Sequence, residues 1–334
     1  MIKLEDEYKS ALKNYKFIDL FCGIGGFHLA LSSFGAECVF ASDIDASACE
    51  VYKNNFNIEP EGDIKKVEIK NKIPAHDILC AGFPCQAFSI SGNQEGFKDK
   101  KSGKLFDEIM DIVNIHKPKL ILLENVANLE KHNKGKTIKT IKEELIKKGY
   151  TSHQKILNSS DYNVPQCRNR IYIVAFRNNI YNKKYNFPDK VERTQKLSDL
   201  RDSHTGVIKK CIIKRKYKIR KNYKEIEKNC KKPYIRIGEI GEGRQGERIY
   251  SEKGCSTTLS SSSGGLGGRT GMYYINNKCR KLTPRECARL MGFPDNFIIS
   301  KSNNQAYKQF GNSVVIDVLQ YIVINIISCI RKEK

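Results

Sequence analysis

Between residues 17 and 176, short apolar segments alternate with helical ones, and this alternation constrains the fold more than any other feature of the chain. It predicts an α/β domain with a mixed, mostly parallel sheet and helices on both faces. In an open sheet of this kind, ligands bind beside the carboxyl ends of the strands. The strands are expected at 17–21, 37–42, 77–83, 119–125 and 170–176, and the helices near 26–34, 46–55, 104–116 and 136–148.

The character of the sequence changes after residue 195. Residues 201–232 carry thirteen Lys and Arg against three Asp and Glu, and residues 238–271 are rich in Gly and Ser. We expect residues 1–195 to form one domain, completed by a C-terminal helix within 308–334, and residues 196–307 to form a smaller, irregular, β-rich one. The apolar run at 314–330 is interrupted by polar residues, so it predicts a buried helix rather than a membrane span.

Composition narrows the class of protein. Fifty-nine Lys and Arg against 37 Asp and Glu give a formal charge of +22, which suits a polyanionic partner, although solvated lysine faces would give the same count. Twelve cysteines without a CxxC pair argue against a zinc site or a disulfide framework and fit a reducing compartment. The N-terminus has no signal peptide, so a cytoplasmic location is expected.

The segment FIDLFCGIGGFHLAL at 17–31 predicts a strand, a glycine turn and a helix. The backbone of such a glycine turn can approach a ligand closely. Asp43 ends the next strand, where a carboxylate can hold ribose hydroxyls. Asp19 lies inside the first strand, which is typical of S-adenosylmethionine sites rather than dinucleotide sites. Asp63 follows a further short strand and is either an adenine contact or an exposed turn residue.

Three further features suggest chemistry. Cys85 follows Pro84 on the turn after an apolar strand, where helix amides would stabilise a thiolate; most free cysteines, however, are small buried hydrophobes. Glu124 closes another strand, where burial would raise its pKa and make it a proton donor, unless it caps a helix. Arg168 and Arg170 are expected on one face at the start of a strand, unless they are ordinary surface charges.

Together these motifs resemble those of the bacterial DNA (cytosine-5) methyltransferases. FIDLFCGIGG, GFPCQAFS, ENV, QCRNR, RKLTPRECARLMGFPD and FGNSVV occur in the family's order between residues 17 and about 320. The resemblance implies a Rossmann-like fold that uses S-adenosylmethionine, yields S-adenosylhomocysteine and needs no metal. It also implies that residues 1–195 and 308–334 form the catalytic and cofactor-binding domain, and that residues 196–307 form the target-recognition domain and hinge.

The resemblance also implies the chemistry. Cys85 adds to carbon 6 of cytosine, Glu124 binds or protonates ring nitrogen 3, and carbon 5 then takes the methyl group. Arg168 contacts the base oxygen, while Arg170 supports Glu124 or a phosphate, and the base that removes the carbon 5 proton is left open. The cofactor positions carried over are Phe21, Gly23, Ile24, Gly26, Asp43, Ile44, Asp63, Ile64, Leu105, Asn312 and Val314.

The implied partner is double-stranded DNA, from which the target base is flipped under a lid at 89–103. Ser91 and Gln245 would fill the gap left by the base, while Arg244 and Arg248 would read guanine edges or contact phosphates. Ile44 stands where relatives often carry an aromatic residue. The serine run SSSSGG in the recognition loop leaves the target open, with GCGC or another short palindrome containing GC as the first expectation.

The resemblance further implies a monomer with no membrane partner, whose cognate restriction endonuclease acts on the same site without a stable complex. Three alternatives stay open at this point: an RNA cytosine methyltransferase of the same fold, a nucleotide-dependent oxidoreductase, and a DNA-binding module that has lost catalysis. The oxidoreductase leaves Cys85 and Glu124 unexplained, and the inactive module would have replaced one of them. The basic, glycine-rich second domain favours duplex DNA over RNA.

Overall fold

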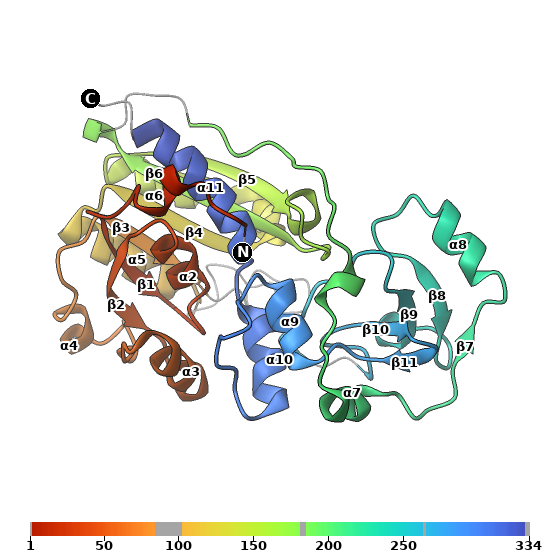
Figure 1. Cartoon of the computed structure of the whole chain (residues 1–334). Coiled ribbons are helices and arrows are strands. Elements are labelled where there is room, and N and C mark those ends of the chain that lie inside the picture. The colour runs from red at the N-terminus through yellow and green to blue at the C-terminus, as the bar shows by residue number, and fades with distance from the viewer. Residues whose placement is uncertain (1, 84–101, 181–184, 263–264, 331–334) are drawn as a thin grey trace. The chain divides into compact units, whose positions relative to one another are not determined.

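A computed structural model describes residues 2–83, 102–180, 185–262 and 265–330. The chain divides into two compact units (Figure 1). We call them the six-strand unit, formed by residues 2–157, 169–189 and 318–334, and the five-strand unit, formed by 158–168 and 190–317.

The six-strand unit contains a mixed sheet in the order β2-β1-β3-β4-β6-β5. Strands β1 to β4 run parallel, and β6 runs antiparallel to β4. All five expected strands are present, with ends shifted by a few residues at most, which confirms the α/β prediction. Their bounds are β1 Lys16–Leu20, β2 Glu37–Ser42, β3 Ile78–Ala81, β4 Leu120–Val126, β5 Tyr150–Asn158 and β6 Asn169–Arg177.

Strand β5 is absent from the sequence prediction, and its burial explains why. It lies at the edge of the sheet, and only Tyr150 and Leu157 among its residues are buried. An edge strand with mostly polar side chains has no apolar run by which it can be recognised.

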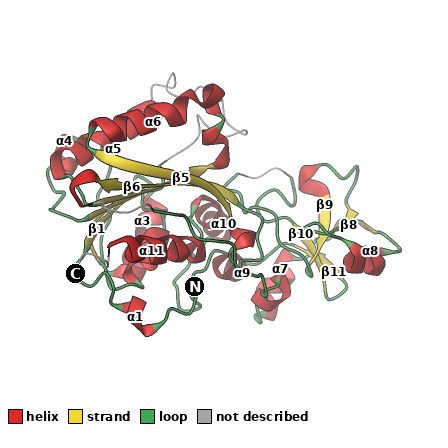
Figure 2. Cartoon of the chain, turned by 90° about the horizontal axis from the view of Figure 1, so that it is seen from above, coloured by secondary structure: helices red, strands yellow, loops and turns green. Residues whose placement is uncertain are grey.

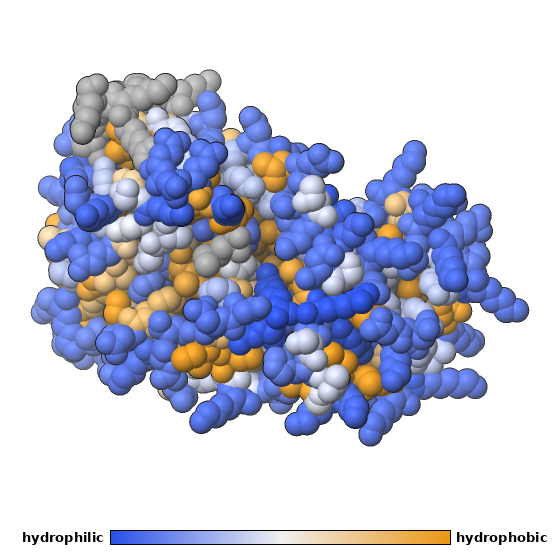
Figure 3. Space-filling model, in the orientation of Figure 1, coloured by the Kyte–Doolittle hydropathy of each residue, from blue (hydrophilic) through white to orange (hydrophobic). Residues whose placement is uncertain are grey.

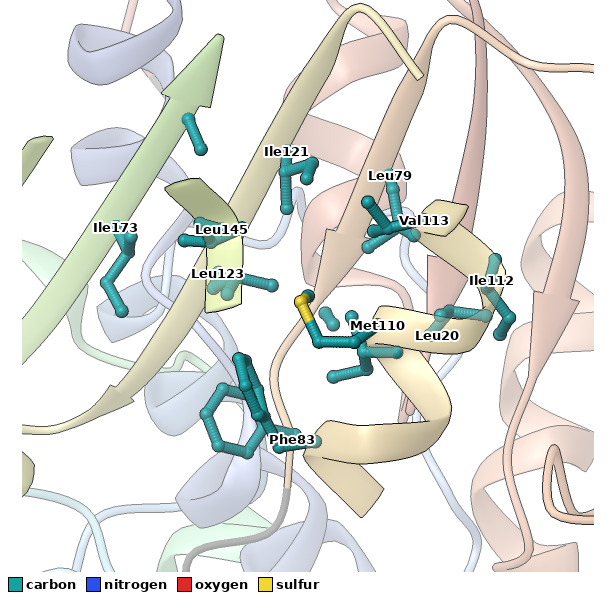
Figure 4. Packing of buried hydrophobic residues seen from close by; sticks show 14 of the residues in the cluster. Leu20, Leu79, Phe83, Met110, Ile112, Val113, Ile121, Leu123, Leu145 and Ile173 are labelled. Atoms are coloured by element: carbon teal, nitrogen blue, oxygen red, sulfur yellow. The ribbon is translucent and has the colours of Figure 1, made fainter. Parts of the chain in front are cut away.

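Helices cover both faces of this sheet. Figure 2 shows α5 and α6 on one face and α11 on the other. On the first face, alternate residues of the strands pack against α5 and α6, as Leu79, Ile121 and Val113 illustrate in Figure 4. The helices of this unit are α1 Asp6–Lys9, α2 Gly26–Ser32, α3 Ala46–Phe56, α4 Val67–Lys70, α5 Ser102–His116 and α6 Lys136–Lys147, with short 3-10 turns at Ala127–Glu130, His132–Gly135 and Asn178–Ile180.

The C-terminal helix α11, Ile316–Ile330, carries the long apolar run. By length and composition, the stretch Asn303–Ile330 could cross a membrane. Its apolar side chains are instead packed inside the protein, since Leu319, Ile322 and Ile326 have no exposed surface. The prediction of a buried helix is confirmed.

The five-strand unit has the strand order β11-β10-β9-β8-β7. Its core consists mainly of isoleucines, such as Ile237 and Ile249, together with Met272. The strands are β7 Lys218–Ile219, β8 Arg236–Glu239, β9 Arg248–Ser251, β10 Met272–Ile275 and β11 Lys278–Arg280. The helices are α7 Thr205–Cys211, α8 Tyr223–Asn229, α9 Pro284–Leu290 and α10 Asn303–Asn312, with 3-10 turns at Ser159–Asp161, Leu197–Leu200 and Gln245–Glu247.

Candidate active site

The backbone of the turn between β1 and α2 adopts a left-handed conformation at several residues, which allows a ligand to lie close to it. Phe21, Gly23 and Gly25 all have positive φ angles of 55°, 53° and 84°. A side chain at Gly25 would collide with the ring of Phe56, whereas one at Gly23 would meet nothing within 4 Å. The glycine at 25 is therefore needed for packing against α3, and the backbone at 23 is open to a ligand.

Asp43 holds this turn in place. Its Oδ2 accepts a hydrogen bond of 2.8 Å from the backbone N–H of Gly23, and its Oδ1 accepts one of 2.8 Å from that of Asp45. The carboxylate thus fixes the turn while remaining half-buried at the end of β2. A carboxylate has further lone pairs, so these two bonds leave acceptor capacity for hydroxyl groups.

Asp19 lies beneath the same turn and is completely buried. Neither of its side-chain oxygens accepts a geometrically sound hydrogen bond within the described residues. Burial raises the pKa of Asp19 well above its usual value, Asp43 raises it further, and the backbone N–H of His28 lowers it only in part. An ionised Asp19 therefore calls for a positive charge close to the turn.

The remaining expected cofactor positions of this unit differ in exposure. Ile44 is 78% exposed, an unusual state for a large apolar side chain at a strand end. The segment after Glu61 runs beside the end of β2, which brings Asp63 to the same edge, where its Oδ2 lies 3.1 Å from Lys65 Nζ. Ile64 is 2% exposed and packs in the core, so only its backbone is available to a ligand.

The other members of the expected set line the turn or lie elsewhere. Ile24 is buried and Gly26 begins α2, so both contribute backbone to the turn. Leu105 is half-buried near the start of α5. Asn312 and Val314 belong to the five-strand unit, at the end of α10, where Asn312 is exposed and Val314 is buried.

Glu124 and Arg170 form a buried ion pair at the end of two neighbouring strands. Arg170 Nε lies 3.0 Å from Glu124 Oε1, and the two side chains are 16% and 9% exposed. The antiparallel register of β4 and β6 pairs Glu124 with Tyr172 and Val126 with Arg170, so the sheet itself brings the two charges together. A planar guanidinium at this distance fixes the orientation of the Glu124 carboxyl group.

The chain that leads to Cys85 passes this ion pair. A side chain at Gly82 would lie 3.9 Å from Glu124 Oε2, and the Asn125 side-chain amide donates a 3.3 Å hydrogen bond to the carbonyl of Phe83. Cys85 itself, like Ser91, lies outside the described residues. The acid and the residues that immediately precede Pro84-Cys85 therefore share one strand-end region.

Arg168 does not share the surroundings of Arg170. Strand β6 begins at Asn169, and the Arg168 side chain is 2% exposed and hydrogen-bonded to backbone carbonyls of the five-strand unit. Its Nη1 donates to Leu259 O at 2.9 Å, and its Nη2 donates to Gly311 O at 2.9 Å and Ser313 O at 2.7 Å. Arg168 thus lies at the start of the strand as expected, but carbonyls at and near the end of α10 and that of Leu259 bind its guanidinium.

Three of the expected DNA-reading residues, Arg244, Gln245 and Arg248, lie on or beside one turn of the five-strand unit, and the glycine-rich segment packs against this turn. The backbone N–H of Gly267 donates to Gly246 O at 2.9 Å, which joins the glycine-rich segment to the turn containing Gln245. Gln245 and Arg244 are exposed, and Arg244 Nη2 lies 2.7 Å from Glu242 Oε2. Arg248 is half-buried, with its Nε donating to Gly243 O at 3.3 Å.

Comparison with known proteins identifies the family. A model of the C-5 cytosine-specific DNA methylases matches residues 15–328. The chain belongs to this family. It is 49% identical over 326 residues to the type II methyltransferase M.HhaI of Haemophilus parahaemolyticus, an alignment that covers 98% of this chain and 97% of the relative. It is 39% identical to M.HpaII of Haemophilus parainfluenzae, over 92% of this chain and 88% of that one.

Solved structures support the methyltransferase fold. The crystal structure of the Dnmt2 methyltransferase of S. pombe is similar with a TM-score of 0.69 at 21% identity, covering 94% of this chain and 98% of the other. That of the Entamoeba histolytica methyltransferase EhMeth has a TM-score of 0.70 at 20% identity. The expected Rossmann-like methyltransferase fold and the enzyme class, a DNA cytosine-5 methyltransferase, are thus confirmed.

One feature of this methyltransferase goes beyond the sequence prediction. The aromatic support of the glycine turn was not predicted: the ring of His28 stacks on Phe56 with centroids 3.8 Å apart, and its Nδ1 lies 2.7 Å from the Tyr52 hydroxyl. The spacing of His28, Tyr52 and Phe56 on two helices gives no periodic signal. Within the described residues, no group of three or more His, Cys, Asp or Glu side chains is arranged to hold a metal ion.

Proposed function

We propose that this enzyme transfers a methyl group from S-adenosylmethionine to carbon 5 of a flipped-out cytosine in a short duplex DNA sequence, through a covalent bond to Cys85. The observation that carries the proposal is the Glu124–Arg170 ion pair beside Gly82 and Phe83. Cys85 is the second residue after Phe83 in the sequence. Family membership supplies the reaction class.

The residues around the glycine turn fit S-adenosylmethionine. This cofactor supplies an electrophilic methyl group on a positive sulfonium, together with an ammonium group. Those charges would meet the need of the buried Asp19, which has no counter-charge within the described residues. Asp43 would accept ribose hydroxyls, Asp63 and the backbone of Ile64 would contact the adenine edge, and the exposed Ile44 would cover one adenine face.

Each catalytic group has a distinct role in this proposal. The Cys85 thiolate forms a bond to carbon 6, and the ring electrons move toward carbon 5 and nitrogen 3. Glu124 hydrogen-bonds or protonates nitrogen 3, while Arg170 holds the Glu124 carboxyl in position. Carbon 5 takes the methyl group, then loses its proton to a base that is not yet assigned, and the returning electron pair expels the thiolate.

The proposed role of Arg168 in contacting the base oxygen needs revision. Its Nη groups donate to three backbone carbonyls, so we assign it the task of joining the residue 158–168 segment to the end of α10. Arg170, on the strand that carries the ion pair, is the better candidate for orienting the base. The proposed contacts with DNA remain those of Ser91, Gln245, Arg244 and Arg248. The proposed contacts with the cofactor still include Asn312 and Val314.

The relatives named as type II methyltransferases support a restriction-modification role. In this proposal the enzyme is a monomer of the bacterial cytoplasm that associates with the nucleoid through DNA. A cognate endonuclease acts on the same sequence without forming a stable complex. The domains are 1–195 with 308–334 for catalysis and cofactor binding, and 196–307 for target recognition.

Bisulfite sequencing of DNA from a host that expresses the chain tests the proposal and reads out the target. We expect one short sequence to be protected from conversion, with GCGC or another palindrome containing GC as the first candidate. The Cys85→Ser variant should show no protection while binding duplex DNA with little change, because base flipping does not need the covalent bond. Protection by that variant, or methylation of tRNA but no duplex, would refute the mechanism or the substrate.

A further inference from the structure

Residues 209–232, which we call the basic segment, carry charges that the proposed function does not use. Twelve Lys and Arg side chains in the basic segment are exposed, against only two acids, Glu225 and Glu227. None of the twelve forms an ion pair or a side-chain hydrogen bond with another described residue. They are Lys209, Lys210, Lys214, Arg215, Lys216, Lys218, Arg220, Lys221, Lys224, Lys228, Lys231 and Lys232.

The basic segment is a folded layer. Apolar side chains alternate with the cations and pack against the core of the five-strand unit, among them Ile213, Tyr217, Tyr223 and Ile226. Tyr217 and Tyr223 both contact Tyr274 of β10 edge to face, with ring centroids 6.5 Å and 5.8 Å apart. In α8, Tyr223 and Ile226 are half-buried against the core of the unit, while Lys224 and Lys228, one turn apart, are exposed.

The lysines of α6 differ from those of the basic segment in that two of them pair with acids. On α6, Lys139 and Lys147 lie 3.8 Å and 2.7 Å from Glu143 and Glu144, which are one turn away on the same helix. In the basic segment, Glu227 is bound by Lys253 and Ser251 from outside the segment. Figure 3 shows the surface over β7 and α8 as mainly hydrophilic.

Protection of a sheet edge explains only part of this pattern. Strand β7 is the edge of the five-strand sheet, and an exposed lysine there hinders pairing with another chain. That explanation covers Lys218, the one cation of the two-residue strand. It does not cover the cations of α7, α8 and the connecting turns, which present no open strand edge.

Strand register relates the basic segment to the DNA-reading loop. Lys218 is opposite Glu239, and Glu239 is opposite Arg248, which begins β9 directly after Gln245–Glu247. Two strand spacings of about 4.8 Å place Lys218 roughly 10 Å from Arg248 across the sheet. The basic segment and the loop that contains Arg244 and Gln245 are therefore joined to strands of one sheet that are separated only by β8.

We propose that the basic segment is a second, sequence-independent binding surface for the phosphate backbone of duplex DNA that flanks the methylated sequence. The inference rests on the proposed function, because the register argument takes the loop at 244–248 as the part that reads the target. Cations spaced along a folded edge contribute affinity through counterion release and carry no base recognition. The enzyme would thus hold DNA on which it has not yet found a target.

The test removes four of these charges, as Lys218→Gln, Lys221→Gln, Lys224→Gln and Lys228→Gln in one variant. Binding of duplex DNA is measured against salt for a duplex of about one helical turn, roughly 10 base pairs centred on the target, and for one about four times longer. On the long duplex we expect affinity to fall at least about tenfold and the slope of log Kd against log salt to drop by about 0.9 per lost phosphate contact. On the short duplex, affinity and kcat should stay within about twofold.

A matched variant controls for total charge. Lys9→Gln, Lys53→Gln, Lys139→Gln and Lys147→Gln together remove four lysines that form ion pairs with acids in the six-strand unit. This variant should keep the salt slope of the wild type. Equal losses in both variants, or an unchanged slope in the first, would overturn the inference while leaving methylation intact. An enzyme that methylates no duplex at all would instead overturn the proposed function.

Discussion

Charged side chains in the two units have different surroundings. At the strand ends of the six-strand unit, two carboxylates meet defined neighbours: Glu124 meets Arg170, and Asp43 meets the Gly23 amide. In the basic segment of the five-strand unit, twelve cations are exposed and pair with no acid among the described residues. Buried charges are strong and sensitive to position, whereas exposed ones are weak individually and screened by salt.

We infer from this difference that the paired strand-end groups determine the rate of methyl transfer, whereas the exposed cations determine the affinity for DNA. A group that binds or protonates one ring nitrogen must be held by its neighbours, so its removal should change kcat and leave DNA affinity alone. A cation that attracts phosphates can act from many positions, so its removal should change affinity and salt dependence alone. The predictions below test this separation, beginning with the largest expected effect.

Glu124→Gln should lower kcat by about 10²- to 10⁴-fold, because the amide keeps the shape but cannot donate a proton to ring nitrogen 3 as the acid does. The Kd for duplex DNA should change little. Single-turnover transfer of labelled methyl, with binding measured in parallel, gives both quantities. Glu130→Gln, a change at the 3-10 turn that follows the same strand, serves as the control. A loss of less than about tenfold at Glu124 would remove it from the chemistry.

Arg168→Leu should destabilise the protein by about 3 kcal/mol or more, because it leaves three buried carbonyls without their donor at about 1 kcal/mol or more each. Urea unfolding measures this, and Arg201→Leu, which removes a more exposed arginine paired with Glu252, should cost much less. If Arg168→Leu instead keeps the unfolding free energy of the wild type but loses kcat, Arg168 acts in the reaction rather than in folding.

The sequence predicted the positions of Glu124 and the glycine turn, but it did not predict the contacts of Arg168. Glu124 could be found because the apolar run of β4 ends at ENV, and the glycine turn because strand, glycines and helix are contiguous. The partners of Arg168 lie 91 to 145 residues away, in segments with no pattern that relates them to it. Contacts at that separation depend on tertiary packing, which local periodicity does not encode.

The stability of the protein should fall as the pH drops from about 6.5 to 4. Burial lowers the pKa of His28 and of His76 to about 4, so both stay neutral in the folded protein while the unfolded chain takes up protons below 6.5. Each group therefore costs up to about 3 kcal/mol of unfolding free energy across that interval. His28→Phe should flatten the pH dependence of the unfolding free energy measured in urea.

Asp19→Asn gives the sharpest test of whether a buried charge at the turn serves the cofactor or the fold. Since the folded-state pKa of Asp19 is raised, ionisation costs stability as the pH rises above the unfolded value of 3.8, and the amide avoids that cost. We therefore expect a higher Tm without cofactor at pH 7, and a Kd for S-adenosylmethionine that is weaker by about tenfold, or about 1.4 kcal/mol.

Differential scanning calorimetry with and without cofactor measures both effects on one sample. Asp45→Ala, which removes the N-cap of α3 near the same turn, is the control and should lower the Tm instead. If Asp19→Asn lowers the Tm and leaves cofactor binding unchanged, Asp19 is a structural acceptor. Asp19 would then be an exception to the rule that charges buried at the strand ends serve binding or catalysis, whereas exposed charges attract DNA.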